Sequence, residues 1–310
     1  MQNASYPLKL DQIHELDNLE LVAGSVVEGF ITGLHKSPFH GFSVEFAEHR
    51  IYNTGESTRH VDWKLFGRTD KLFVKKFEEE TNLRCYIVVD TSSSMLFPYR
   101  DNKKVSKLTF SVVSAAALIH LLRRQRDAVG LTLFSNEIDL QTPSRLSSVH
   151  ARHLFNELQK LISPDFTALK RTTSAAKSLH LIAENTHKRS LIILFSDMIS
   201  SEDPEEIFAA LQHLRHKKHD VILFHVTDKK LEQDFTFGNR PFRFIDMETG
   251  AELKLNPNNI REEYILAMNK FLSQLKLRCG QYNIDLVEAD INENFSEVLQ
   301  PFILKRSKLY

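Results

Sequence analysis

Polar residues that suit cation binding follow an apolar run near residue 90. Residues 85–89 (CYIVV) are apolar and mostly β-branched or aromatic, which is typical of a strand buried on both faces. The run ends at Asp90, and ligands bind at the carboxyl ends of strands in open α/β sheets. Asp90, Ser92 and Ser94 alternate, so an extended or loosely turned segment would point their oxygens toward one spot. Such oxygens suit a hard cation such as Mg²⁺.

Two later positions add oxygen ligands to this set. Thr167 lies in a predicted loop, and Asp197 follows a second buried apolar run at residues 190–195. The intervals from Asp90 to Thr167 and from Thr167 to Asp197 each hold whole strand–helix units. We therefore expect all these groups to converge at one carboxyl edge of a sheet. Only Asp90 and Asp197 are charged, so a divalent cation would stay electrophilic and accept an acidic side chain of a partner. The alternative interpretation is a serine-rich turn that caps a helix and shows no metal dependence.

The chain from residue 81 to 310 predicts the sheet that would position these groups. Strands and helices alternate, which indicates a mainly parallel sheet covered by helices on both faces. An inserted β-hairpin is predicted at about 228–256. Further strands are predicted at 129–134, 137–141, 221–226 and 284–288, and helices at 105–126, 149–162, 169–183, 203–217, 259–278 and 294–305. We expect Gly280 to end the long helix at 259–278, and the strand at 284–288 to be the last of the chain.

Residues 1–80 predict a separate, smaller β-rich appendage. Residues 10–34 favour a helix at first, which we expect glycines to break at Gly24, Gly29 and Gly33. Residues 42–46 and 72–77 alternate with period two and predict strands.

The only tryptophan lies between these two predicted strands, among charged residues. We interpret the cluster as a set of ion pairs that holds the appendage together, because buried charges are usually paired. The alternative is a binding surface, which exposed apolar area around the tryptophan would favour. The cluster comprises Arg59, Asp62, Trp63 and Arg68.

Composition and missing motifs exclude several other functions. Forty basic residues balance forty acidic ones without a basic, aromatic-rich stripe, so no nucleic-acid partner is expected. No apolar run approaches the roughly 18 residues of a membrane span, and no signal-peptide core opens the chain, so a cytoplasmic protein without membrane insertion is expected. Cys85 and Cys279 are expected as reduced thiols, and His213, His216 and His219 as a solvated helix end.

The three oxygen-bearing segments resemble the metal-ion-dependent adhesion site of von Willebrand factor A domains. Asp90, Ser92 and Ser94 match its first motif, Thr167 its second and Asp197 its third. The resemblance implies a von Willebrand factor A (Rossmann-like) fold that binds Mg²⁺ (or Mn²⁺) at these five residues.

A longer stretch is similar to the "domain of unknown function 58" family. The similarity rests on F-A-E-H-R at 46–50, Y-N-T-G at 52–55, R-H-V-D-W at 59–63 and D-A-V-G-L-T-L-F at 127–134. It spans about residues 41–197, with Glu56 where the family has aspartate. Asp165 and Phe166 stand before Thr167, where A domains often have glycines. Proteins of this family are typically paired with MoxR-type AAA+ ATPases, so the resemblance implies such a partner.

The sequence therefore predicts a non-enzymatic, metal-dependent protein-interaction module, an adaptor or co-chaperone of a MoxR-type ATPase. The alternative is a metal-dependent hydrolase, a phosphatase or nuclease, that uses the same site. Asp90 stands where haloacid dehalogenase-type phosphatases keep their nucleophile, but Ser92 stands where they need a second acid. The chain also lacks a Walker phosphate loop, a nucleophile elbow and a dinucleotide fingerprint.

Overall fold

The computed structural model describes residues 19–33, 46–52, 61–77, 83–98, 105–163, 174–199, 202–293, 295 and 300. The chain forms two compact units. The small unit is 38–82, and the main unit contains 1–37 together with 83–310.

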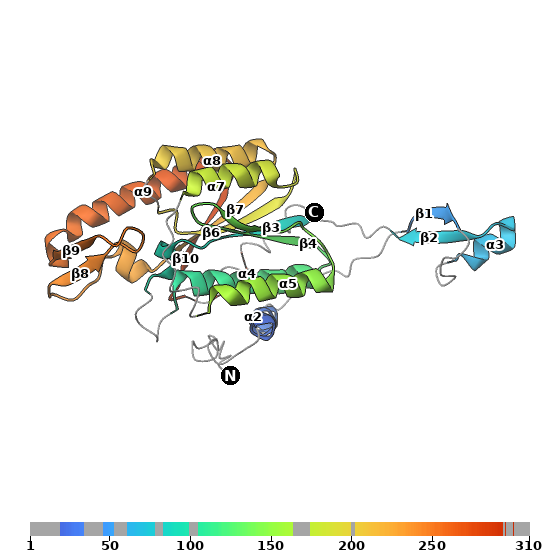
Figure 1. Cartoon of the computed structure of the whole chain (residues 1–310), viewed down its shortest axis with the longest axis horizontal. Coiled ribbons are helices and arrows are strands. Elements are labelled where there is room, and N and C mark those ends of the chain that lie inside the picture. Colours follow the sequence, from blue (N-terminus) through green and yellow to red (C-terminus); the bar gives the residue numbers. More distant parts are fainter. Residues whose placement is uncertain are drawn as a thin grey trace. The chain divides into compact units, whose positions relative to one another are not determined.

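The main unit is built on a six-stranded sheet with the order β10-β7-β6-β3-β4-β5 (Figure 1). All neighbouring strands in it are parallel except β4 and β5, which pair antiparallel at one edge. The predicted α/β fold with a mainly parallel central sheet is therefore confirmed. The strands are β3 (Arg84–Asp90), β4 (Ala128–Phe134), β5 (Ile138–Gln141), β6 (Leu191–Ser196), β7 (Asp220–Thr227) and β10 (Asp285–Asp290).

The strand order creates a switch point between β3 and β6. Counted along the chain within this sheet, the order is 3-2-1-4-5-6, in which the chain first builds outward on one side of β3 and then on the other. Loops that leave β3 and β6 therefore run in opposite directions, and this leaves a crevice at the carboxyl ends of the two strands. Both strands are buried over nearly their whole length, as the apolar runs predict.

Helices cover both faces of this sheet. Figure 1 shows α4 and α5 on one face and α7 and α8 on the other. The apolar residues of α7, α8, β6 and β7 pack into one hydrophobic core cluster. The helices are α4 (Lys107–Arg124), α5 (Ser148–Leu161), α7 (Ala175–Asn185), α8 (Pro204–His216) and α9 (Arg261–Gln281). All five lie where the sequence predicts helices, although Gly280 does not end α9 as expected.

Helix α2 (Leu19–Gly33) packs against α4 in the main unit. The expected breaks at Gly24 and Gly29 are absent, because the helix runs through both. A Cβ at Gly24 would lie 3.5 Å from the His120 ring of α4, so the glycine allows the two helices to approach closely. The apolar side of α2 is buried and comprises Leu19, Val22, Ala23, Val26 and Val27. This second layer explains why α4 is buried nearly all round.

The small unit contains an antiparallel pair of strands, β1 (Phe46–Ile51) and β2 (Phe73–Phe77), which confirms its β-rich character. Most of the strand predicted at 42–46 lies outside the described residues. A short helix, α3 (Trp63–Thr69), connects the strands and was not predicted. It begins where the Asp62 carboxylate accepts hydrogen bonds from the backbone N–H groups of Lys64 and Leu65.

After β7, within the range of the predicted insertion, β8 (Phe242–Ile245) and β9 (Glu252–Leu255) pair as an antiparallel hairpin. The helix predicted at 294–305 lies almost wholly outside the described residues. Cys85 and Cys279 are both buried thiols. Among the described helices, none is long and apolar enough to cross a membrane.

Candidate cation site

The first part of the site is a turn at the end of β3. Asp90 is fully buried, and its Oδ1 accepts a hydrogen bond from the Ser92 N–H at 3.0 Å. The N–H and hydroxyl groups of Thr91 both donate to Phe134 O, which holds the turn on β4. Ser93–Leu96 forms a short 3-10 helix, and the hydroxyl oxygens of Ser92 and Ser94 come within 3.0 Å of each other. The turn therefore brings the alternating side chains together as the sequence predicts.

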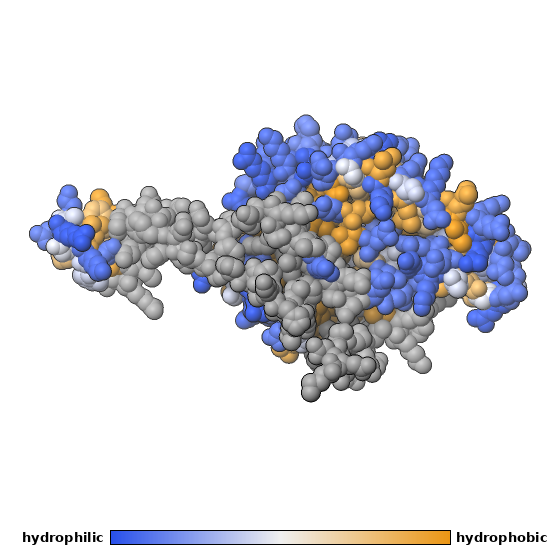
Figure 2. All heavy atoms as spheres, turned by 180° about the vertical axis from the view of Figure 1, so that it is seen from behind, coloured by the Kyte–Doolittle hydropathy of each residue, from blue (hydrophilic) through white to orange (hydrophobic). Residues whose placement is uncertain are grey.

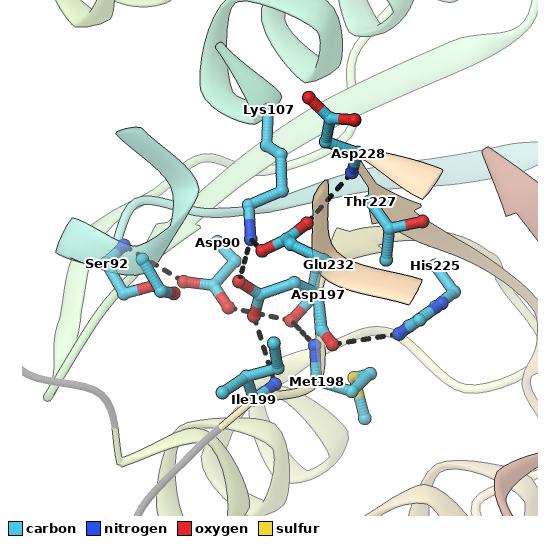
Figure 3. Close-up of polar contacts among 12 residues, drawn as sticks. Asp90, Ser92, Lys107, Asp197, Met198, Ile199, His225, Thr227, Asp228 and Glu232 are labelled. Atoms are coloured by element: carbon cyan, nitrogen blue, oxygen red, sulfur yellow. Dashed lines mark hydrogen bonds and ion pairs between the residues drawn. The ribbon is translucent and has the colours of Figure 1, made fainter. Parts of the chain in front are cut away.

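The second part of the site is the end of β6. Ser196 Oγ donates a hydrogen bond to Asp90 Oδ2 at 2.7 Å and accepts one from the Met198 N–H at 2.9 Å. Asp197, the next residue, is also fully buried (Figure 3). Burial, followed by the nearby Asp197 carboxylate, raises the pKa of Asp90 to about 7. The switch point thus concentrates acidic groups that a cation would stabilise.

Asp197 is fixed by groups from three other places in the chain. Its Oδ1 accepts a hydrogen bond from the Ile199 N–H at 3.0 Å, and its Oδ2 accepts one from Lys107 Nζ at 2.7 Å. Its backbone carbonyl accepts a hydrogen bond from His225 Nε2 at 3.0 Å. Burial lowers the pKa of His225. Because a carbonyl oxygen can only accept, the contact requires a proton on Nε2.

Sequence reasoning missed Ser196, Lys107 and Glu232, which contact the predicted ligands or their neighbours. Lys107 begins α4, and Glu232 lies in η3 (Lys229–Gln233), a π-helical turn after β7. The sequence contains one indication of the role of Lys107. A lysine in the first turn of a predicted helix interacts unfavourably with the helix dipole, which suggests that acidic groups elsewhere stabilise it.

The donor set fits a hard divalent cation. The Ser92 and Ser94 hydroxyls hydrogen-bond to each other at 3.0 Å, and adjacent ligands of an octahedral Mg²⁺ with metal–oxygen distances of about 2.1 Å also lie about 3.0 Å apart. Two carboxylates, Asp90 and Asp197, share the same buried crevice. Within the described ranges no three His, Cys, Asp or Glu side chains form a metal cluster, so hydroxyls would have to supply part of the coordination.

The structure brings four of the five predicted ligands to the switch point: Asp90, Ser92, Ser94 and Asp197. Thr167, the fifth, lies outside the described residues. Ser94 is partly exposed whereas Asp90, Ser92 and Asp197 are not, so the site reaches solvent on the side of Ser94.

The charged cluster around the tryptophan lies in the small unit. Asp62 caps α3, and Trp63 is 61% exposed with its ring edge-on to Phe66. The side chain of Arg68 makes no hydrogen bond or ion pair with the part of the chain that the structure describes. Arg59 lies outside that part. Figure 2 shows hydrophobic and hydrophilic residues side by side on this unit, at the left.

A pocket also lies elsewhere, between α7 and α8. Its volume is about 440 Å³, and its lining includes Lys177, His180 and Glu206. Among the described residues that line it, none carries a hydroxyl, so we place the candidate site at the ends of β3 and β6.

The fold and site define an α/β domain with an oxygen-lined crevice at the switch point of its sheet. The chain belongs to the family described as "Protein of unknown function DUF58", whose model matches residues 48–271. Two similar proteins are "Uncharacterized protein Rv1480" from Mycobacterium tuberculosis (strain ATCC 25618 / H37Rv) and "Uncharacterized protein Mb1516" from Mycobacterium bovis (strain ATCC BAA-935 / AF2122/97). Each is 23% identical over 218 residues, which cover 69% of this chain and 65% of the relative's length.

Several solved structures resemble the main part of the chain. The conserved hypothetical protein BatB from Bacteroides thetaiotaomicron aligns with a TM-score of 0.43 and 15% identity, over 73% of this chain and 98% of BatB. An aerotolerance-related membrane protein from Bacteroides fragilis NCTC 9343 aligns with a TM-score of 0.42 and 16% identity, over 74% of this chain and all of that one. The SpRpn10 VWA domain aligns with a TM-score of 0.37 and 10% identity, over 71% and 94%.

Proposed function

We propose that this chain is a non-enzymatic protein-interaction module that binds Mg²⁺ (or Mn²⁺) at the switch point of its sheet. The residues that would hold the cation are Asp90, Ser92, Ser94, Thr167 and Asp197. The observation that supports this most is the convergence of buried carboxylates and paired hydroxyls where β3 and β6 diverge. A bound cation would offer a Lewis-acidic position to a carboxylate of a partner.

The chain's own residues favour recognition over hydrolysis. Both oxygens of Asp90 accept hydrogen bonds, from the Ser92 N–H and from Ser196 Oγ, and the side chain is fully buried. A nucleophilic carboxylate would have to reach its substrate instead. Ser94 is the most exposed of the described ligands, so a partner would approach from its side.

The proposed partner is a MoxR-type AAA+ ATPase, and the proposed role is that of an adaptor or co-chaperone. This proposal is carried over from the family resemblance. A cytoplasmic location stays a prediction.

The test is calorimetric titration of Mg²⁺ and Mn²⁺ into the full chain, beside Asp90→Asn, followed by capture of a MoxR-type ATPase with and without EDTA. We expect one cation site that Asp90→Asn weakens strongly, and capture that both EDTA and the variant abolish. Capture that is indifferent to both would overturn the proposal. Asp90-dependent phosphate release from p-nitrophenyl phosphate would favour the hydrolase instead.

A further inference from the structure

A buried lysine lies beside the candidate cation site. Lys107 is 1% exposed, and its Nζ lies 2.7 Å from Asp197 Oδ2 and 2.5 Å from Glu232 Oε1 (Figure 3). Lysine is almost never fully buried unless it is paired. Here two carboxylates pair with it, and one of them belongs to a predicted cation ligand.

Besides these two ion pairs, the ammonium group lies over the Phe97 ring, 5.8 Å from its centroid, but other features of its location are unfavourable. Lys107 is the first residue of α4, where the helix dipole disfavours a positive charge. The group is also buried, so the Asp197 and Glu232 carboxylates are the anions that offset the loss of its hydration. These acids account for its position.

Both acids are held independently of Lys107. Glu232 Oε2 accepts a hydrogen bond from the Asp228 N–H at 2.8 Å, and the backbone carbonyl of Glu232 accepts one from the Tyr264 hydroxyl at 2.8 Å. Asp197 is held by the Ile199 N–H and by His225. The lysine thus connects two prepositioned anions that come from the ends of β6 and β7.

Lys107 and Glu232 contribute opposite formal charges beside Asp197. Removing either charge therefore alters the net formal charge near the predicted ligands by one unit, but in opposite directions.

We propose that Lys107 is a positioning residue that holds Asp197 Oδ2 and its charge away from the cation-binding hydroxyls, and so sets the cation affinity of the site. This inference rests on the proposed cation site. The ion pair with Lys107 offsets part of the negative charge of Asp197, so less of that charge is left to offset a divalent cation. The site is thereby kept short of negative charge, which favours an acidic group from a partner.

Two single substitutions test the proposal, since they change the charge in opposite directions. Lys107→Met keeps most of the aliphatic stem, removes the ammonium group and frees Asp197 Oδ2. Its dissociation constant for Mn²⁺ should fall at least about tenfold, because a unit charge a few ångströms away is removed from a buried site. Glu232→Gln leaves Lys107 to Asp197 alone, and its dissociation constant should rise by a similar factor.

The double variant Lys107→Met/Glu232→Gln is the matched control. It restores the formal charge of the wild-type crevice, so its affinity for Mn²⁺ should lie between those of the single variants. Calorimetry with Mn²⁺ alone gives the affinities, and thermal unfolding in EDTA shows whether each variant folds. A lysine that only supports the structure predicts weaker binding in both single variants.

The outcomes separate this inference from the proposed function. Mn²⁺ binding by Lys107→Met but not by the wild type would support the inference and contradict the native cation site. Binding by the wild type that Lys107→Met leaves unchanged or weakens would overturn the inference and leave the cation site standing. If Lys107→Met does not fold, Glu232→Gln decides, and unchanged or tighter binding by that variant overturns the inference. An absence of Mn²⁺ binding in the wild type and in all variants would overturn both.

Discussion

Ser196 Oγ donates a hydrogen bond to Asp90 Oδ2 across the carboxyl ends of two neighbouring strands, at 2.7 Å. The backbone ladder between β3 and β6 ends with the pair Val89 and Phe195. The side-chain bond continues the contact one residue further, where the two loops diverge. It fixes the orientation of the Asp90 carboxylate, because the Ser92 N–H holds the other oxygen.

The first prediction concerns this bond. Ser196→Ala should lower the free energy of unfolding by about 2 kcal/mol, because it leaves a buried carboxylate oxygen and the Met198 N–H without their partner. Urea unfolding measures the difference. Ser163→Ala is the matched control, since its hydroxyl donates to Lys160 O at an exposed position and should cost less than about 0.5 kcal/mol. Equal costs in the two variants would contradict the role given to Ser196.

The second prediction concerns a close approach inside the sheet. A Cβ at Gly130 of β4 would lie 2.9 Å from Thr142 O and 2.9 Å from Tyr86 Cδ1. Gly130→Ala should therefore lower the free energy of unfolding by about 1–3 kcal/mol, because a backbone oxygen and a ring of β3 must shift. Gly238→Ala is the control, since no heavy atom lies within 4 Å of its added Cβ. Urea midpoints that shift equally for both would contradict the packing described.

The third prediction uses the single tryptophan as a probe of the small unit. Trp63 is 61% exposed, so iodide should quench its fluorescence nearly as well as that of free tryptophanamide. Weak quenching would mean that the ring is covered and would support the structural interpretation of its cluster. A blue shift on addition of a partner, absent with Asp62→Ala, would place binding on α3, because Asp62 caps that helix.

The sequence predicts the sheet well because buried parallel strands have a strong apolar signature, and the strands at 85–89 and 190–195 are of this kind. It also predicts that the side chains of Asp90, Ser92, Ser94 and Asp197 gather at the ends of these strands, since these residues follow them directly; that they bind a cation stays a prediction. It does not predict Lys107 or Glu232, which meet only after α4 and the turn after β7 are packed. Gly24 was misjudged for a related reason: contact with α4 stabilises α2 beyond its intrinsic propensity.

His219 differs most from the sequence-based expectation among the three histidines at the end of α8. It was expected on a solvated helix end, but it is fully buried where the chain turns into β7. The Ser190 N–H donates to Nδ1 of the His219 ring at 3.4 Å, and the backbone N–H of His219 donates to Leu214 O. Burial lowers the pKa of His219, because a charged ring would lose its hydration there.

The fourth prediction is that this histidine makes the protein less stable at mildly acidic pH. The folded protein keeps His219 neutral, whereas the unfolded chain binds a proton near pH 6.5, so the unfolded state gains protons first as the pH falls. The free energy of unfolding should decrease below pH 6.5 by up to about 1.4 kcal/mol per pH unit for this group. Urea unfolding at pH 7.5 and 5.5 should show a shallower pH dependence for His219→Gln, while the exposed His216→Gln keeps that of the wild type. A His219→Gln variant that loses as much stability as the wild type over this range would show that His219 is not held neutral by burial.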